Sequence, residues 1–173
     1  HEITALRGAR QIVSGGRSMC ARQESGQVRC VSLDREDAAA ASPAVVAIPG
    51  LDDAIDLVGG STEICAARAA GAAACFSDAD PIHLQRGTYK AGEFQLRPAP
   101  HLRGLRSVAI GGLHRCGVRL DGQVVCWGLD QGTLGRYARE ASQPVPAPVK
   151  GLADAVELFT GENRSCARRR SGK

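Results

Sequence analysis

Seven cysteines carry the most distinctive reactive chemistry of this 173-residue chain. Thiols form disulfides, ligate metals or act as nucleophiles, and their spacing helps to separate these roles. Zinc-binding cysteines usually stand about two to four positions apart, and a catalytic thiol is a single activated cysteine. Matched pairs ten positions apart favour structural disulfides over metal ligands or unpaired thiols, and six cysteines form such pairs: Cys20 with Cys30, Cys65 with Cys75, and Cys116 with Cys126. The same spacing places a mate for Cys166 beyond Lys173, so we expect Cys166 to be unpaired or bonded to another chain.

A glycine turn lies at the centre of each cysteine pair. The turn residues are Ser25-Gly26, Ala70-Gly71 and Asp121-Gly122, with Ser171-Gly172 in a fourth copy. A three-residue hairpin loop often has a type I turn followed by a left-handed residue, which favours glycine. This register places the two cysteines opposite each other, at Cα separations of about 4.5 to 5.5 Å that suit a disulfide. Each bridge should contribute about 2 to 3 kcal/mol. Disulfides imply an extracytoplasmic location: secreted, periplasmic or at the cell surface.

The cysteine pairs belong to a longer repeat of about fifty residues, a period typical of propellers and solenoids. Five positions before each first cysteine stands a glycine: Gly15, Gly60, Gly111 and Gly161. A short apolar strand precedes that glycine, and a Gly-Leu turn with a proline-bearing link precedes the strand. One repeat is therefore a small antiparallel sheet, which must stack on its own copies because it cannot bury both faces alone. We expect blades over 1–50, 51–103 and 104–150, with a long loop at 78–101 and a partial blade at 151–173.

The third repeat resembles the regulator of chromosome condensation repeat. The resemblance rests on Gly-Gly-Leu-His-Arg-Cys at 111–116, Leu-Asp-Gly-Gln-Val-Val-Cys-Trp-Gly at 120–128 and Gln-Gly-Thr-Leu-Gly at 131–135. The first two repeats have Val31-Ser32 and Phe76-Ser77 in place of Trp127-Gly128. In that family seven repeats form a circular β-propeller, and the cysteine-paired version is similar to secreted bacterial relatives. The resemblance implies an all-β chain of about three and a half repeats. We expect a fragment of a longer propeller, half of a two-chain ring or a subunit of a larger assembly.

Propellers display their loops on two surfaces, so the first functional hypothesis is a protein-interaction or structural scaffold module. The turns before the first cysteines supply candidate partner contacts, with ordinary solvated turn residues as the alternative interpretation: Arg17, Glu63, His114, Arg115 and Arg164. A second hypothesis is a secreted inhibitor that binds an enzyme through a propeller surface. A third, implied by the family resemblance, is guanine nucleotide exchange on a small GTPase with chromatin binding. The paired cysteines argue against the third, because nuclear and cytosolic proteins rarely keep disulfides.

We expect neither enzymatic activity nor a cofactor. The four histidines, His1, His83, His101 and His114, lack metal-ligand spacing, and no nucleophile elbow or phosphate loop is present. The net charge is only +4, and the basic cluster near the end indicates a solvated strand rather than a nucleic-acid site: Arg164, Arg168, Arg169, Arg170 and Lys173. No apolar run approaches the roughly 18 residues of a membrane helix. The chain begins at His1 without a leader, so we expect a removed signal peptide or an excised segment.

Overall fold

The computed structural model describes residues 6–16, 18–32, 45–61, 63–69, 72–76, 97–129, 134 and 142–173. These residues form fourteen β-strands, and no α-helix occurs among them. No helix in this part of the chain is long and apolar enough to span a membrane. The all-β fold predicted from the repeats is therefore confirmed.

Four antiparallel sheets follow one another along the chain. Sheet 1 contains β1 (Ala9–Gly15), β2 (Ser18–Gln23), β3 (Val28–Ser32) and β4 (Val45–Ala47). Sheet 2 contains β5 (Ala54–Gly59), β6 (Ile64–Arg68), β7 (Ala72–Phe76) and β8 (Arg97–Arg103). Sheet 3 contains β9 (Leu105–Ile110), β10 (His114–Arg119), β11 (Val124–Leu129) and β12 (Ser142–Pro148). Sheet 4 contains β13 (Ala155–Thr160) and β14 (Ser165–Arg169).

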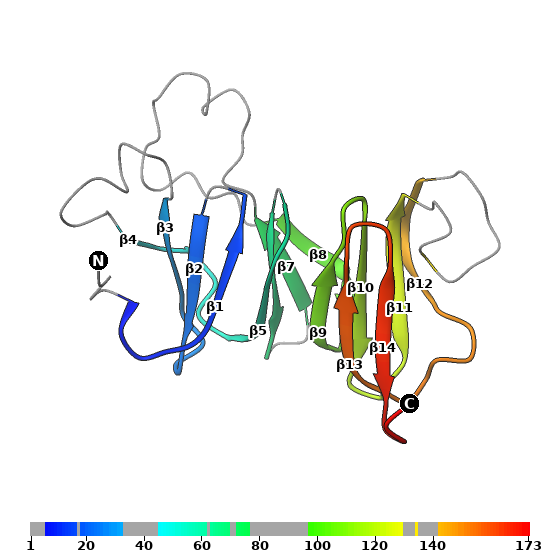
Figure 1. Ribbon diagram of the computed structural model, residues 1–173. Helices are drawn as coiled ribbons and strands as arrows, with labels where there is room; N and C mark the ends of the chain where they lie inside the picture. The colour runs from blue at the N-terminus through cyan, green and yellow to red at the C-terminus, as the bar shows by residue number, and fades with distance from the viewer. Residues whose placement is uncertain are drawn as a thin grey trace.

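Sheets 1, 2 and 3 follow one another in chain order across the view, and sheet 4 overlaps sheet 3 there (Figure 1). The first strand of sheet 4, β13, contacts β9 and β10 of sheet 3. Within each sheet, sequential strands pair with each other as simple up-and-down neighbours. The first strand of each sheet contacts the first strand of the next sheet, so β1, β5, β9 and β13 follow one another across the array. We call these four strands the inner strands. We call the side of a sheet that faces the next sheet along the chain its trailing face, and the opposite side its leading face.

The cysteine hairpins have the predicted register. In each hairpin the two cysteines lie directly opposite one another on neighbouring strands. The three predicted disulfides are confirmed, and they join Cys20 to Cys30, Cys65 to Cys75, and Cys116 to Cys126. Their Cα atoms are 4.0 to 4.1 Å apart, which is closer than the separation expected from the sequence. The structure therefore corrects the expected Cα separation and confirms which cysteines pair.

The hairpin turns also have the predicted backbone conformation. Gly26, Gly122 and Gly172 have the left-handed φ angles 88°, 92° and 84°. Gly71, the corresponding glycine of the second pair, lies outside the described residues. The glycine of the fourth copy thus has the same left-handed φ as its equivalents.

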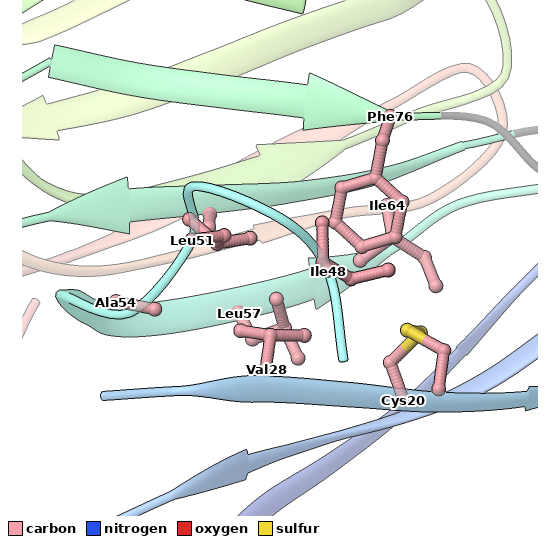
Figure 2. Packing of buried hydrophobic residues seen from close by; sticks show 10 residues of the cluster. Cys20, Val28, Ile48, Leu51, Ala54, Leu57, Ile64 and Phe76 are labelled. Carbon is pink, nitrogen blue, oxygen red and sulfur yellow. A yellow bond between two sulfur atoms is a disulfide. The ribbon is translucent and has the colours of Figure 1, made fainter. Parts of the chain in front are cut away.

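The hydrophobic core lies between successive sheets. Figure 2 shows Cys20 and Val28 on the trailing face of sheet 1, packed against sheet 2. Sheet 2 contributes Leu57, Ile64 and Phe76, and each of these five residues is at most 2% exposed. The clusters between sheets 2 and 3 and between sheets 3 and 4 likewise contain the disulfide cysteines of the earlier sheet. Stacking thus buries a face that a single small sheet would leave in water.

Trp127 has a packing role in this arrangement. It follows Cys126, is 8% exposed and belongs to the cluster between sheets 2 and 3. Val31 and Phe76 occupy the same position in the first two repeats and are both 2% exposed. Trp127 and Phe76 therefore fill space between sheets. Val31 instead packs with Leu6 and Ala21 on the outer face of sheet 1.

Two of the outer strands, β8 and β12, contain prolines of the predicted links. β8 and β12 each lie at a sheet edge, where a missing backbone N–H disrupts no ladder. The loop expected over 78–101 lies largely outside the described residues, and its last part is instead the beginning of β8. The sequence misplaced that end because Pro98 and Pro100 resemble loop residues, although an edge strand tolerates them.

Substituting Gly122 tests how the hairpin turns are packed. Its φ is positive, and an added Cβ would lie 2.8 Å from the backbone oxygen of Ala153. Gly104 also has a positive φ, 68°, but an added Cβ there would meet nothing within 4 Å. We expect Gly104→Ala to cost about 1 to 2 kcal/mol from backbone strain alone. Gly122→Ala should cost about 2 to 4 kcal/mol, because overpacking adds to that strain. Urea titration of the two variants measures both values, and equal losses would show that the turn is not tightly packed.

Candidate functional site

The turns between the first and second strands of each sheet form one edge of the sheet array. We call this edge the glycine rim and define it by the described residues 15–16, 60–61, 63, 111–114 and 161–164. Each of the last three turns closes with the same backbone hydrogen bond, in which Gly60, Gly111 or Gly161 donates to the carbonyl three residues later at 2.8 Å. The repeated glycines therefore give three turns of one shape at equivalent places.

Backbone hydrogen bonds also join neighbouring turns of the rim. The N–H of Gly16 donates to the carbonyl of Gly60 at 3.2 Å, and the N–H of Gly112 donates to that of Glu162 at 2.9 Å. Cβ atoms would not fit here, because one built on Gly112 would lie 2.9 Å from the same carbonyl oxygen. Backbone hydrogen bonds therefore join the first turn to the second and the third turn to the fourth.

An ion pair links the middle of the rim. Arg115 of sheet 3 donates from Nε to the Glu63 carboxylate of sheet 2, and both side chains are partly buried. Glu63 also lies close to the sulfurs of Cys65 and Cys75, a group that could hold a metal if the thiols were free. Those sulfurs are bonded to each other, so the group is not a metal site in the oxidised protein. Glu63 and Arg115 therefore serve the junction of two sheets.

His114 lies inside the junction of sheets 3 and 4. It is 1% exposed, and its Nε2 is 2.8 Å from the Ser165 hydroxyl of β14. Burial, and secondarily the cation of Arg115, lower the pKa of His114 below its usual 6.5. The neutral imidazole is thus a buried polar link between two sheets. The prediction that His114 contacts a partner is corrected, because its side chain does not reach the surface.

The exposed side chains of the rim differ from most of those that the sequence singled out. Arg164 is exposed as predicted, whereas Arg17 lies outside the described residues. Leu113 is 54% exposed, and Glu162 and Asn163 beside Arg164 are exposed as well. Sequence reasoning did not select Leu113. The signal that could have found it is an apolar side chain inside a glycine turn, where no buried strand position requires an apolar residue.

A groove of about 500 Å³ follows the inner strands of the array. Its polar groups serve mainly to connect strands. Gln11 accepts the Leu57 N–H at 3.0 Å and donates to the Leu57 carbonyl at 2.7 Å. Arg106 donates to the carbonyl of Ala155 at 2.7 Å. These side-chain hydrogen bonds connect inner strands that form no backbone ladder with each other. Few polar groups of the groove therefore remain available to bind a ligand.

The stacked four-stranded sheets, the adjacent inner strands and the glycine turns define a partial β-propeller of the regulator of chromosome condensation type. The sequence matches no protein-family model and no curated protein. Comparison with solved structures shows the fold.

Yeast RCC1 (Prp20), solved bound to Kap60, matches at a TM-score of 0.69 and 18% identity over 95% of this chain. A second structure of Prp20p, from Saccharomyces cerevisiae, gives 0.66 and 20% over 93%, and human WBSCR16 gives 0.66 and 14% over 94%. The chain spans only 40%, 43% and 44% of those three chains, respectively.

The pH dependence of stability tests the role of His114. Folding lowers the pKa of His114, so the imidazole binds a proton more readily in the unfolded chain than in the folded chain. The stabilising contribution is complete above a pH of about 6.5 and is lost as the pH falls below that value. We expect His114→Gln, which keeps a hydrogen-bonding group but cannot be protonated, to flatten the decline between about pH 7.5 and 5. Urea titrations of both proteins measure the two slopes. The carboxylates titrate equally in both, so parallel slopes would show that His114 does not contribute.

Proposed function

We propose that the chain is a non-enzymatic, disulfide-stabilised scaffold module that binds a protein partner through the glycine rim. The observation that carries this proposal is the exposed group on the rim: Leu113, Glu162, Asn163 and Arg164. An apolar side chain beside one arginine and one carboxylate suits a mixed protein surface better than a small metabolite. Sheet junctions below the rim hold its backbone in place, so little ordering cost accompanies binding.

We also propose that the protein acts outside the cytoplasm. Three disulfides tie hairpins whose cores contain many small side chains, and such bonds persist in oxidising compartments. The nucleotide-exchange alternative draws on the family resemblance, and the yeast neighbour is known for binding to Kap60, Gsp1p and histones. This chain spans less than half of that protein, and its paired cysteines favour a different compartment.

Paired variants test the proposed interface. We expect the immobilised chain to retain one stoichiometric protein from the extracytoplasmic fraction of its host. The double variant Leu113→Asp, Arg164→Glu should lower that retention at least about tenfold, because it removes an apolar anchor and reverses a charge. Leu120→Asp is the matched control, since Leu120 is 72% exposed on a hairpin turn outside the rim. Retention that survives the double variant, or falls equally in the control, would contradict the proposal. If the retained protein is an enzyme that loses activity on binding, the inhibitor hypothesis becomes the specific form of this function.

Thiol trapping tests the proposed compartment. Intact host cells are treated with a membrane-permeant maleimide before lysis, and the mass of the trapped chain is measured. We expect six of the seven cysteines to escape labelling, because they are paired in disulfides. Labelling at all seven positions would place the protein in a reducing compartment and contradict the proposed location.

A further inference from the structure

The disulfide between Cys65 and Cys75 differs from the other two in its accessibility. Cys75 is only partly buried, whereas the five other paired cysteines are at most 2% exposed. Reduction requires a reductant to reach one sulfur of the bridge, and a fully buried sulfur is reached only after local unfolding. The Cys65–Cys75 bridge is therefore the disulfide that a reductant reaches most readily in the folded chain.

A carboxylate lies beside this bridge. Glu63 comes two positions before Cys65, directly before β6 begins. One carboxylate oxygen of Glu63 lies within 4.8 Å of both sulfur atoms. The glycine turn fixes the backbone of this residue, because the N–H of Gly60 donates to the Glu63 carbonyl at 2.8 Å. Three side chains that can ligate a metal thus meet at the junction of sheets 2 and 3.

The other two cysteine hairpins do not form such a group. The position two residues before the first cysteine holds Ser18 in sheet 1 and His114 in sheet 3. Ser18 offers a neutral hydroxyl, and the Nε2 atom of His114 is paired with the Ser165 hydroxyl at 2.8 Å. Within the described ranges, the Glu63 group is the one cluster of three histidine, cysteine or acidic side chains with metal-ligating atoms this close together. The two other bridges are therefore internal controls for it.

The charges around the bridge favour a divalent cation once the thiols are free. Two thiolates and the Glu63 carboxylate together carry three negative charges. Arg115, which donates from Nε to Glu63, balances one of them, and a divalent cation balances the other two. The Glu63 and Arg115 side chains are only 16% and 31% exposed, so an unbalanced charge here is costly. Thiolates are soft ligands, and they select Zn²⁺ over Mg²⁺ or Ca²⁺.

We propose that the Cys65–Cys75 bridge is a redox-sensitive disulfide, and that its reduction creates a Zn²⁺ site formed by Glu63, Cys65 and Cys75. Three protein ligands leave the fourth position of a tetrahedral zinc ion to a water molecule. The site uses neither Leu113 nor Arg164. Its failure is therefore distinguishable from a failure of the partner proposed for the glycine rim.

The chemical steps balance with a phosphine as the reductant. The phosphorus attacks the Cys75 sulfur, the S–S bond breaks, and Cys65 leaves as a thiolate. Water then releases Cys75 as a thiol and gives a phosphine oxide, so the two sulfurs gain the two electrons that phosphorus loses. Zn²⁺ binding displaces the remaining thiol protons, because the thiolate is the form that ligates the metal.

Limited reduction followed by metal titration tests the proposal. The exposed Cys166 thiol is first blocked with iodoacetamide, and the chain then receives one equivalent of a water-soluble phosphine. We expect mass mapping of a labelled aliquot to place the new thiols at Cys65 and Cys75. Co²⁺, whose thiolate complexes have a charge-transfer absorption, should then bind in a one-to-one complex that Zn²⁺ displaces. The fully oxidised chain should show no such absorption.

Two carboxylate variants identify the third ligand. Glu63→Gln should weaken Co²⁺ binding at least about tenfold, because an amide provides no anionic oxygen. Glu162→Gln removes an exposed carboxylate of the same rim that is not part of the donor group, so it should bind Co²⁺ like the wild type.

Circular dichroism and a disulfide count show whether each singly reduced chain stays folded with its other two bridges closed. The proposal is wrong if another bridge opens first, or if the folded, singly reduced chain takes up no Co²⁺. It is equally wrong if Glu63→Gln binds Co²⁺ as tightly as the wild type, or if only unfolded chains take up the metal.

Discussion

The structure depends on one constraint: a single sheet of four short strands leaves both of its faces in water, so every sheet must lie against another. Each trailing face supplies the disulfide sulfurs and small apolar residues, and each leading face supplies larger side chains such as Leu57 and Phe76. Burial between sheets is therefore the principal source of stability. At sheet 1 the chain itself covers part of the outer face, where Ala21 and Val31 are buried with Leu6.

The composition suits this close stacking. The chain is only 3% aromatic and has 21 glycines. A Cβ on Gly59 would collide with the backbone of Ser14, and one on Gly26 would lie 2.8 Å from the carbonyl of Asp52. Neighbouring sheets can approach this closely only where side chains are absent. A core of small residues buries less apolar area per sheet, and the three hairpin disulfides compensate by restricting the unfolded chain.

Side chains fall into two groups according to whether a neighbouring sheet covers them. Gln11, Arg106, His114 and the Glu63–Arg115 pair connect sheets, and their polar groups are used within the molecule. Leu113 and Arg164 lie on the same rim but remain exposed. A buried, hydrogen-bonded group stabilises a junction, whereas an exposed group on the rim is available to a partner.

The sequence by itself determined the hairpins, their left-handed glycines, the three disulfides and the repeated sheets. These features follow from local turn geometry and a two-residue alternation, which depend on neighbours only a few positions away. Only the tertiary structure decided what the equivalent turn residues do. Glu63, His114 and Arg164 share one repeat position, yet the first is in an ion pair, the second is buried and the third is exposed. The reason is physical: the environment of each residue is set by the adjacent sheet, which comes from a segment about fifty residues away and differs at every junction.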